Sequence, residues 1–173
     1  FRTKAEAQQN ARPETVAAEI QAQFDRAVAA GVHPTHMDTH MGVVAYPSLI
    51  PVYLRFCLEH NLPPMVFRMD VAGWMRSGLD RQTAEAAVQQ MGALEAQGMP
   101  MLDHLRMVPL DTPENRLARV QQMLAELEPG ITHFIVHPAK DTPELRAITP
   151  DLACRAADYQ VFTSEAMRHW LRD

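Results

Sequence analysis

The stretch TPENRLARVQQMLAELEPGITHFIVHP, residues 112–138, indicates the fold of this chain. Thr112 precedes a proline and a glutamate, which is typical of a helix start with threonine as N-cap, and we expect that helix to run to about Leu127. A Pro-Gly pair then ends it. Residues 131–137 are the clearest strand signal of the chain. A helix followed by a strand is the building unit of a parallel α/β fold.

The same alternation extends over the whole chain and predicts a parallel sheet with helical crossovers. A complete (β/α)₈ barrel needs about 250 residues, or about 31 per β/α unit. We therefore expect the 173 residues to form one α/β domain over 1–173 with a parallel (β/α) barrel-like fold, an incomplete barrel of about five β/α units. Helices are expected at residues 13–30, 48–60, 82–97, 112–127 and 151–156 and from residue 164, and strands at 35–40, 65–69, 105–110, 131–137 and 159–163.

Composition and charge exclude several classes of partner. Lys and Arg number 16 against 21 Asp and Glu, a net charge of −5, so the chain offers no basic stripe for nucleic acid or anionic lipid. No stretch reaches the roughly 18 apolar residues of a membrane helix. Two cysteines do not make a disulfide framework, which favours the reducing cytoplasm. We expect no nucleic-acid partner, no membrane partner and a cytoplasmic location.

The run HPTHMDTH, residues 33–40, is the most informative for chemistry. In a strand alternate side chains share a face, so His36, Asp38 and His40 are predicted to project together. Imidazole and carboxylate groups are ligands for Zn²⁺ and related ions, and three of them are costly to bury without a metal, a charge partner or hydrogen bonds. From the spacing alone two interpretations stay open: a metal or catalytic site, or an exposed polar strand end that holds at most a His–Asp pair.

Two further polar residues follow predicted strands, where the sites of parallel α/β folds collect. His137 ends the strand 131–137 just before a proline, which favours an extended backbone there. Arg68 lies near the end of the strand 65–69. Each has an ordinary alternative: His137 as a surface residue, and Arg68 in a surface ion pair with Asp70 or with an acidic residue of a helix.

Residues 34–40, PTHMDTH, resemble the P-T-H-x-D-[ST]-H motif of the YdjC-like carbohydrate deacetylases, a family that includes chitooligosaccharide and hopanoid-associated sugar deacetylases. Two later segments are similar to motifs of that family in the same order. VFR at 66–68 is similar to a strand that ends in arginine, and VHPA at 136–139 is similar to an H-P-[AG] segment. The resemblance covers roughly residues 14–170.

The resemblance implies a distorted (β/α) barrel that binds a divalent metal, Mg²⁺ or Zn²⁺, and removes the acetyl group of an N-acetylated sugar or oligosaccharide by hydrolysis. Carried to this sequence, His40 matches the metal-binding histidine, and His36 is a further candidate ligand in the same motif. The candidate catalytic residues are Asp38, His137 and Arg68. His137 would protonate the leaving amine or stabilise the oxyanion, and Arg68 would orient the base or the sugar.

The sequence also departs from the family pattern. The family carries an Asp-Asp pair near its N-terminus, and no Asp-Asp pair occurs here. The other metal-binding histidine of the family lies in a Gly-x-His that follows that pair, and without the pair it is not assigned to any residue here. We therefore expect this chain to correspond to the C-terminal part of such a barrel, with an incomplete site.

Two alternatives to an acetyl-removing enzyme stay open. One is a non-catalytic carbohydrate-binding or subunit-interface module built on the same fold. The other is a different metal-dependent barrel enzyme, such as a sugar isomerase, although few acidic residues follow the predicted strands. An incomplete barrel exposes strand edges and apolar surface, so we also expect a homo-oligomer.

Overall fold

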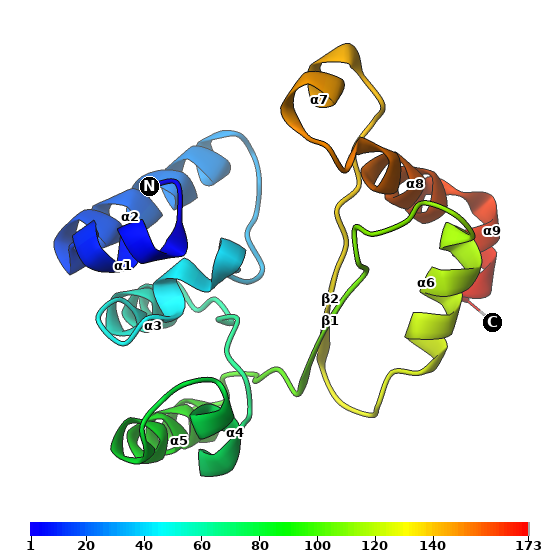
Figure 1. Ribbon diagram of the computed structural model, residues 1–173. Coiled ribbons are helices and arrows are strands. Elements are labelled where there is room, and N and C mark those ends of the chain that lie inside the picture. The colour runs from blue at the N-terminus through cyan, green and yellow to red at the C-terminus, as the bar shows by residue number, and fades with distance from the viewer. Residues whose placement is uncertain (173) are drawn as a thin grey trace. The chain divides into compact units, whose positions relative to one another are not determined.

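The computed structural model describes residues 1–172, which form two compact units. Unit 1 is Phe1–Leu102, and unit 2 begins at Asp103. Unit 1 contains α1 (Lys4–Asn10), α2 (Pro13–Ala29), the 3₁₀ helix η1 (His40–Ala45), α3 (Ile50–Glu59), α4 (Val71–Arg76) and α5 (Arg81–Ala96). Unit 2 contains β1 (His104–Met107), α6 (Arg116–Ala125), β2 (Thr132–Ile135), α7 (Pro143–Ile148), α8 (Leu152–Thr163) and α9 (Glu165–Trp170). Figure 1 labels these elements. The single domain expected over 1–173 stays a prediction.

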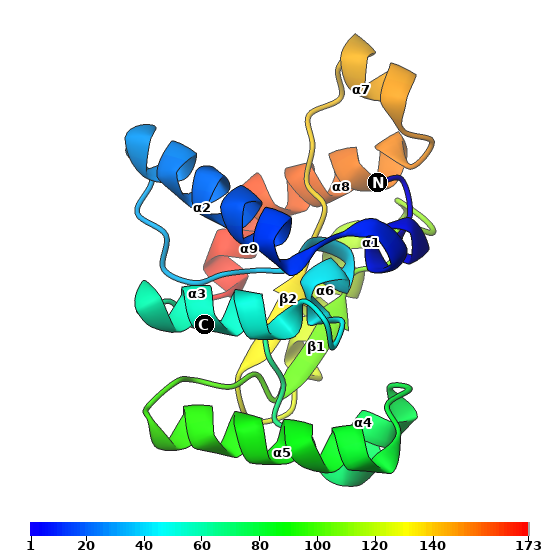
Figure 2. The same cartoon turned by 90° about the vertical axis from the view of Figure 1, so that its left-hand side faces the viewer.

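Helices α2 and α3 pack side by side in unit 1 (Figure 2). α2 begins with proline, which lacks the N–H that would be unpaired there, and Glu14 lies at the positive end of the helix dipole. Its inward stripe places Ile20 in one buried cluster with Phe56 of α3 and Leu62. The rings of Phe24 and Phe56 meet edge to face, with centroids 5.5 Å apart. Both predicted helices are confirmed.

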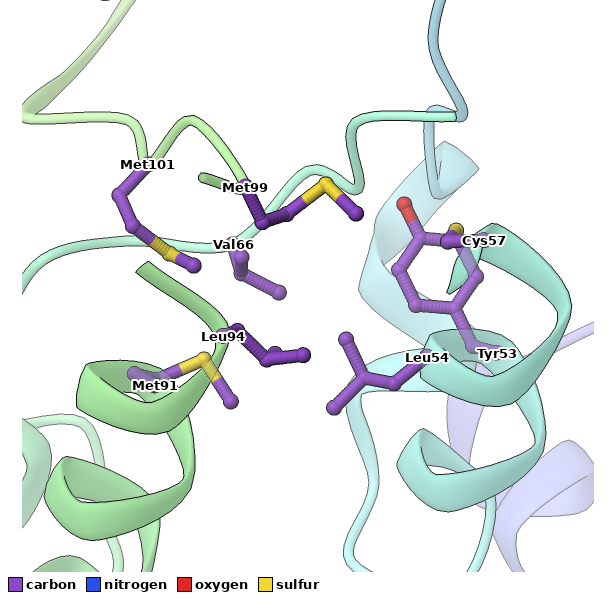
Figure 3. Packing of buried hydrophobic residues seen from close by; sticks show 8 residues of the cluster. All are labelled: Tyr53, Leu54, Cys57, Val66, Met91, Leu94, Met99 and Met101. Carbon is purple, nitrogen blue, oxygen red and sulfur yellow. The ribbon is translucent and has the colours of Figure 1, made fainter. Parts of the chain in front are cut away.

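A second buried cluster joins α3 to α5 and to the loops that follow each helix (Figure 3). Its members are Tyr53, Leu54, Cys57, Val66, Met91, Leu94, Met99 and Met101. Leu54 points from α3 toward Leu94 of α5, while Met99 lies over Val66 (Figure 3). Three of the eight members are methionines, whose unbranched side chains fit irregular gaps between helices and loops.

The two strands predicted in unit 1, at 35–40 and 65–69, are present only as isolated parallel bridges. The bridges are Met37 with Pro64 and Phe67 with Leu102. Two consecutive prolines, at 63 and 64, carry no N–H, so a regular ladder cannot continue through them. Both predictions are corrected to extended segments that keep the expected parallel direction.

Unit 2 contains the α/β unit that residues 112–138 predict. β1 and β2 lie side by side in parallel, and α6 connects them (Figure 1, Figure 2). The register pairs His104 with Thr132 at one end and Met107 with Ile135 at the other. One face of this sheet is covered by α6, α8 and α9 (Figure 1). The buried residues of that layer are Val108, Val120, Val161 and Met167.

The strand predicted at 159–163 is wrong, because these residues belong to the helix α8. The buried residues of α8 are Cys154, Asp158 and Val161, at intervals of four and three residues, which is one stripe of a helix. The aromatic and β-branched residues of this segment favour a strand by propensity. Packing of the stripe against the sheet overrides that propensity.

The other differences concern helix ends and short helices. α6 begins later than predicted, since its N-cap is Asn115, with a left-handed φ of 52°, and not Thr112. The helices α1, α4 and α7 have six or seven residues each and were not predicted. A polar N-cap side chain accepts a backbone N–H at the start of each one. These N-caps are Thr3, Asp70 and Thr142.

The parallel strands and their helical connection confirm an α/β fold. The order of the segments is compatible with a (β/α) barrel, and the barrel itself stays a prediction. No helix within residues 1–172 is both long enough and apolar enough to cross a membrane.

Candidate functional site

Residues 35–39 form an extended segment of unit 1. His36 and Asp38 are exposed, whereas Met37 between them is half-buried and packs against both buried clusters of the unit. The predicted alternation therefore holds for His36 and Asp38. A half-buried Met37 anchors the segment, and the two polar side chains lie on its outer face.

His40 departs from this pattern because it is the first residue of η1. Inside η1, Met41 and Gly42 have φ values of 59° and 68°, in the left-handed region, so the chain turns there. The side chain of His40 is exposed. The structure thus keeps His36 and Asp38 on one face of an extended segment and does not continue that segment to His40.

The hydroxyl of Tyr53 fixes the segment to the rest of unit 1. It donates to the carbonyl oxygen of Met37 at 2.6 Å and accepts the amide of Met65 at 2.7 Å. The amide of Met65 also donates to the carbonyl of Met37 at 3.0 Å. Burial raises the pKa of Tyr53 above its usual range, and it raises the pKa of the neighbouring Cys57 to about 11. Both groups are therefore neutral at pH 7, and the Tyr53 hydroxyl can donate and accept at once.

Within residues 1–172, His36 and Asp38 make only local side-chain hydrogen bonds. Nδ1 of His36 lies 3.0 Å from the hydroxyl of Thr35, and the carboxylate of Asp38 accepts the amide of Thr39 at 2.6 Å. Within residues 1–172 there is no group of three His, Cys, Asp or Glu side chains arranged to hold a metal ion. The residues present therefore do not by themselves complete the metal site that the resemblance implies.

Arg68 is paired with the acidic residue of a helix, which is one of the alternatives left open by the sequence. Its Nε donates to the carboxylate of Glu95 in α5 at 3.0 Å, and its Nη2 donates to the same oxygen. The two side chains are 49% and 44% exposed, so this pair contributes little stability. Asp70 caps α4 by accepting the amide of Gly73 at 2.6 Å.

His137 lies in unit 2, two residues after the end of β2. It is half-buried, and its backbone N–H donates to a carboxylate oxygen of Asp158 in α8 at 3.0 Å. Its ring atom Nδ1 is buried and has no hydrogen-bond partner among the described residues. The position of His137 at the carboxyl end of a parallel strand is as predicted.

Asp158 and Arg116 form a buried ion pair beside His137. The other oxygen of Asp158 accepts Nε of Arg116 at 2.6 Å, and the two side chains are 0% and 3% exposed. Nη1 of Arg116 donates to the carbonyl of Pro109 at 2.7 Å and to that of Thr112 at 3.1 Å. The pair therefore joins α6 and α8 to the loop after β1 and to His137, two residues after the end of β2.

Sequence reasoning missed both members of this pair. Each lies on the buried stripe of its helix: Arg116 precedes the buried Val120 by four residues, and Asp158 follows the buried Cys154 by four. A charged residue at an apolar position of an amphipathic helix is the signal that could have found them.

The candidate residues thus fall into two groups, one in each unit. His36, Asp38, His40 and Arg68 belong to unit 1. His137, with Asp158 and Arg116, belongs to unit 2.

Comparison with known proteins gives a consistent set of relatives. Residues 1–173 match the family model described as YdjC-like protein. A carbohydrate deacetylase of Thermus thermophilus is 34% identical over 167 residues, which is 94% of this chain and 58% of that protein. A carbohydrate deacetylase of Thermoanaerobacter pseudethanolicus is 25% identical over 155 residues, 90% of this chain and 54% of that protein. The chain thus spans little more than half the length of these curated relatives.

A solved structure has the same fold. It is a protein of Enterococcus faecalis V583 described as a candidate cellobiose-phosphate cleavage protein, and it matches with a TM-score of 0.63. The match covers 95% of this chain and 58% of that one, at 18% sequence identity. At this identity the likeness is one of fold.

Proposed function

Since this chain belongs to the YdjC-like protein family, we propose that it takes part in hydrolytic removal of an acetyl group from an N-acetylated sugar or oligosaccharide. The observation that carries the proposal is the 34% identity, over 94% of this chain, to a protein named carbohydrate deacetylase. The exposed His36 and Asp38, which a solvent-borne substrate can reach, add support.

The reaction breaks a C–N amide bond, so it needs three things from a protein. A water molecule must lose a proton, the tetrahedral oxyanion must be stabilised, and the leaving amine must gain a proton. In this proposal His137 protonates the amine or stabilises the oxyanion, and Asp38 is a further catalytic residue. The proton of the water goes to an aspartate of the Asp-Asp pair that the family carries and this sequence lacks. Arg68 orients the base or the sugar.

A divalent metal, Mg²⁺ or Zn²⁺, is the proposed cofactor, with His40 and His36 as its candidate ligands. Such an ion would polarise the acetyl carbonyl and lower the pKa of a bound water. Because the described residues do not gather three ligands, no step of the reaction is assigned to the ion.

The remaining parts of the proposal concern setting and partners. We propose a cytoplasmic protein that self-associates and binds neither nucleic acid nor membrane. Self-association is supported by apolar side chains left exposed on β1, where Leu105 is 43% and Met107 is 51% exposed.

The proposal is tested by acetate release. The full-length protein that carries these residues is incubated with short N-acetylglucosamine oligomers and added Mg²⁺ or Zn²⁺, and acetate is measured with time. His40→Ala is expected to abolish measurable acetate release because a metal ligand is lost. His33→Ala, which changes an exposed histidine just before the motif, keeps the full rate. Full activity of His40→Ala contradicts the role of His40.

The incomplete set of metal ligands favours a second candidate, a non-catalytic carbohydrate-binding or subunit-interface module. The same experiment separates the two. Binding of the oligomers by calorimetry without acetate release, with either metal present, supports the module and overturns the enzyme.

A further inference from the structure

The buried ion pair between Arg116 and Asp158 is expensive, and the proposed reaction does not use it. The two side chains are 3% and 0% exposed. Removing two charges from water carries a penalty that their attraction often fails to offset, and apolar residues of similar size are frequently as stable. The presence of such a pair in a small unit therefore indicates a role other than stability.

The two oxygens of Asp158 have different partners. One accepts Nε of Arg116 at 2.6 Å, and the other accepts the backbone N–H of His137 at 3.0 Å. The orientation of the carboxylate is therefore fixed by Arg116, which is itself held by the carbonyls of Pro109 and Thr112. Through these contacts the position of the His137 amide depends on a rigid side chain in the interior of unit 2.

The ring of His137 has no comparable support of its own. No hydrogen bond reaches its buried Nδ1 from any residue between 1 and 172. The main chain is held on both sides of Pro138. The amide of His137 donates to Asp158, and the amide of Ala139 donates to the carbonyl of Arg155 at 3.1 Å. The backbone fixes the direction in which the side chain of His137 leaves the main chain, and the Asp158 contact is the hydrogen bond to the backbone N–H of His137 itself.

We infer that Asp158, oriented by Arg116, is a positioning residue for His137: it holds the backbone amide so that the imidazole is aimed for proton transfer or oxyanion stabilisation. The inference rests on the proposed function for the role of His137. Its structural half, that Asp158 sets the imidazole, can be measured without any activity.

The test uses the 173-residue chain and a matched control at the N-cap of the same helix. Asp158→Asn keeps the size of the side chain and removes its charge. Asp151→Asn removes the charge of another aspartate, which is bonded to Arg155 through both carboxylate oxygens and has no hydrogen bond to His137. Backbone and imidazole ¹⁵N shifts of His137 are recorded at one pH, with signals assigned by comparison with His137→Gln.

We expect Asp158→Asn to move the His137 amide proton upfield and to shift the imidazole ¹⁵N signals, and Asp151→Asn to leave both unchanged. In acetate release, Asp158→Asn is expected to lower kcat about tenfold to 100-fold with KM unchanged, since misplacement of a reacting group by about 1 Å has effects of this size.

If Asp158→Asn does not fold, Arg116→Met with Asp158→Leu replaces the pair by apolar side chains and is expected to show the same changes in the His137 signals. Unchanged His137 signals in a folded Asp158 variant overturn the inference. So does an equal loss of kcat in Asp151→Asn. If the chain releases no acetate, the proposed function fails for this chain, while the spectra still decide whether Asp158 positions His137.

Discussion

The two units fix their candidate segments by different chemistry. In unit 1 a neutral phenol, Tyr53, bridges the carbonyl of Met37 and the amide of Met65. In unit 2 a charged carboxylate, Asp158, bridges Arg116 and the amide of His137. Both anchors are buried, at 1% and 0% exposure. The Tyr53 hydroxyl needs no counter-charge, whereas the buried carboxylate of Asp158 needs the positive charge of Arg116 beside it.

This difference has an energetic consequence. A hydroxyl that is removed leaves one backbone donor and one backbone acceptor less satisfied, a cost of about 1–3 kcal/mol. A charge that is removed from a buried pair leaves its partner charged and uncompensated, which costs about 3–5 kcal/mol. Removing both charges costs far less. A single substitution is therefore expected to cost more stability in the anchor of unit 2 than in that of unit 1, and only the anchor of unit 2 can recover it in a double variant.

The largest effect is expected from breaking the buried pair on one side. Asp158→Leu leaves the Arg116 guanidinium buried without its carboxylate, so the free energy of unfolding should fall by about 3–5 kcal/mol. Arg116→Met should cost a similar amount. Both are measured by urea unfolding followed by circular dichroism.

The double variant Arg116→Met/Asp158→Leu is the decisive control. It removes both charges from the interior, so it should recover most of the stability lost in either single variant. A double variant as unstable as the sum of the two single ones contradicts the idea of an ion pair whose stability depends on mutual compensation.

A glycine of each unit gives the next comparison. Gly130, before β2, has a φ of 133°, and a Cβ there would lie 2.7 Å from Oδ2 of Asp103. Gly130→Ala therefore combines backbone strain with a collision and should cost about 2–3 kcal/mol. Gly98 of unit 1 has a φ of 86° with nothing within 4 Å of its Cβ position, so Gly98→Ala should cost only about 1 kcal/mol. If urea unfolding shows the same loss of unfolding free energy in Gly130→Ala and Gly98→Ala, the proposed collision with Asp103 is contradicted.

Tyr53→Phe should lower the free energy of unfolding by about 1–2 kcal/mol, because the amide of Met65 keeps its bond to the carbonyl of Met37 when the hydroxyl is lost. The matched control is Tyr46→Phe, since its hydroxyl has no hydrogen bond within the described residues 1–172. Hydrogen exchange of the Met65 amide gives a second measurement, and it should quicken only in Tyr53→Phe. A loss above 3 kcal/mol, equal to that of the ion pair, contradicts the distinction between the two anchors.

The sequence was most informative where the structure of a segment depends on a regular pattern of residues close together in the chain. The stretch 112–138 predicted a helix and a parallel strand, and α6 and β2 confirm them. The strand predicted at 159–163 failed because its residue types favour a strand, while the buried stripe of Cys154, Asp158 and Val161 requires a helix.

Prediction of the site was limited in a similar way. The polar residues of 35–40 could be named from alternation, and His36 and Asp38 do share the exposed face. Neither Tyr53 nor Asp158 could be found as an anchor, because each acts on backbone atoms that are distant in sequence, at 16 and 21 residues. Hydrogen bonds of this range depend on the packing of helices and have no signature in spacing.

The smallest effect is expected from an ion pair of the same chemistry at the surface. The side chains of Asp151 and Arg155 are 22% and 28% exposed, and hydrogen bonds from Arg155 lower the pKa of Asp151 to about 2. A carboxyl group whose pKa is lower in the folded chain contributes stability above its unfolded pKa, near 4, and loses it as the pH falls toward 2. Asp151→Asn should therefore flatten the fall in unfolding free energy between pH 4 and pH 2. High salt should shrink that difference, because it screens exposed charges more than buried ones. The free energy of unfolding is measured in urea at pH 4, 3 and 2. If it falls with pH as steeply in Asp151→Asn as in the unchanged chain, the stabilising role of the Asp151–Arg155 pair is contradicted.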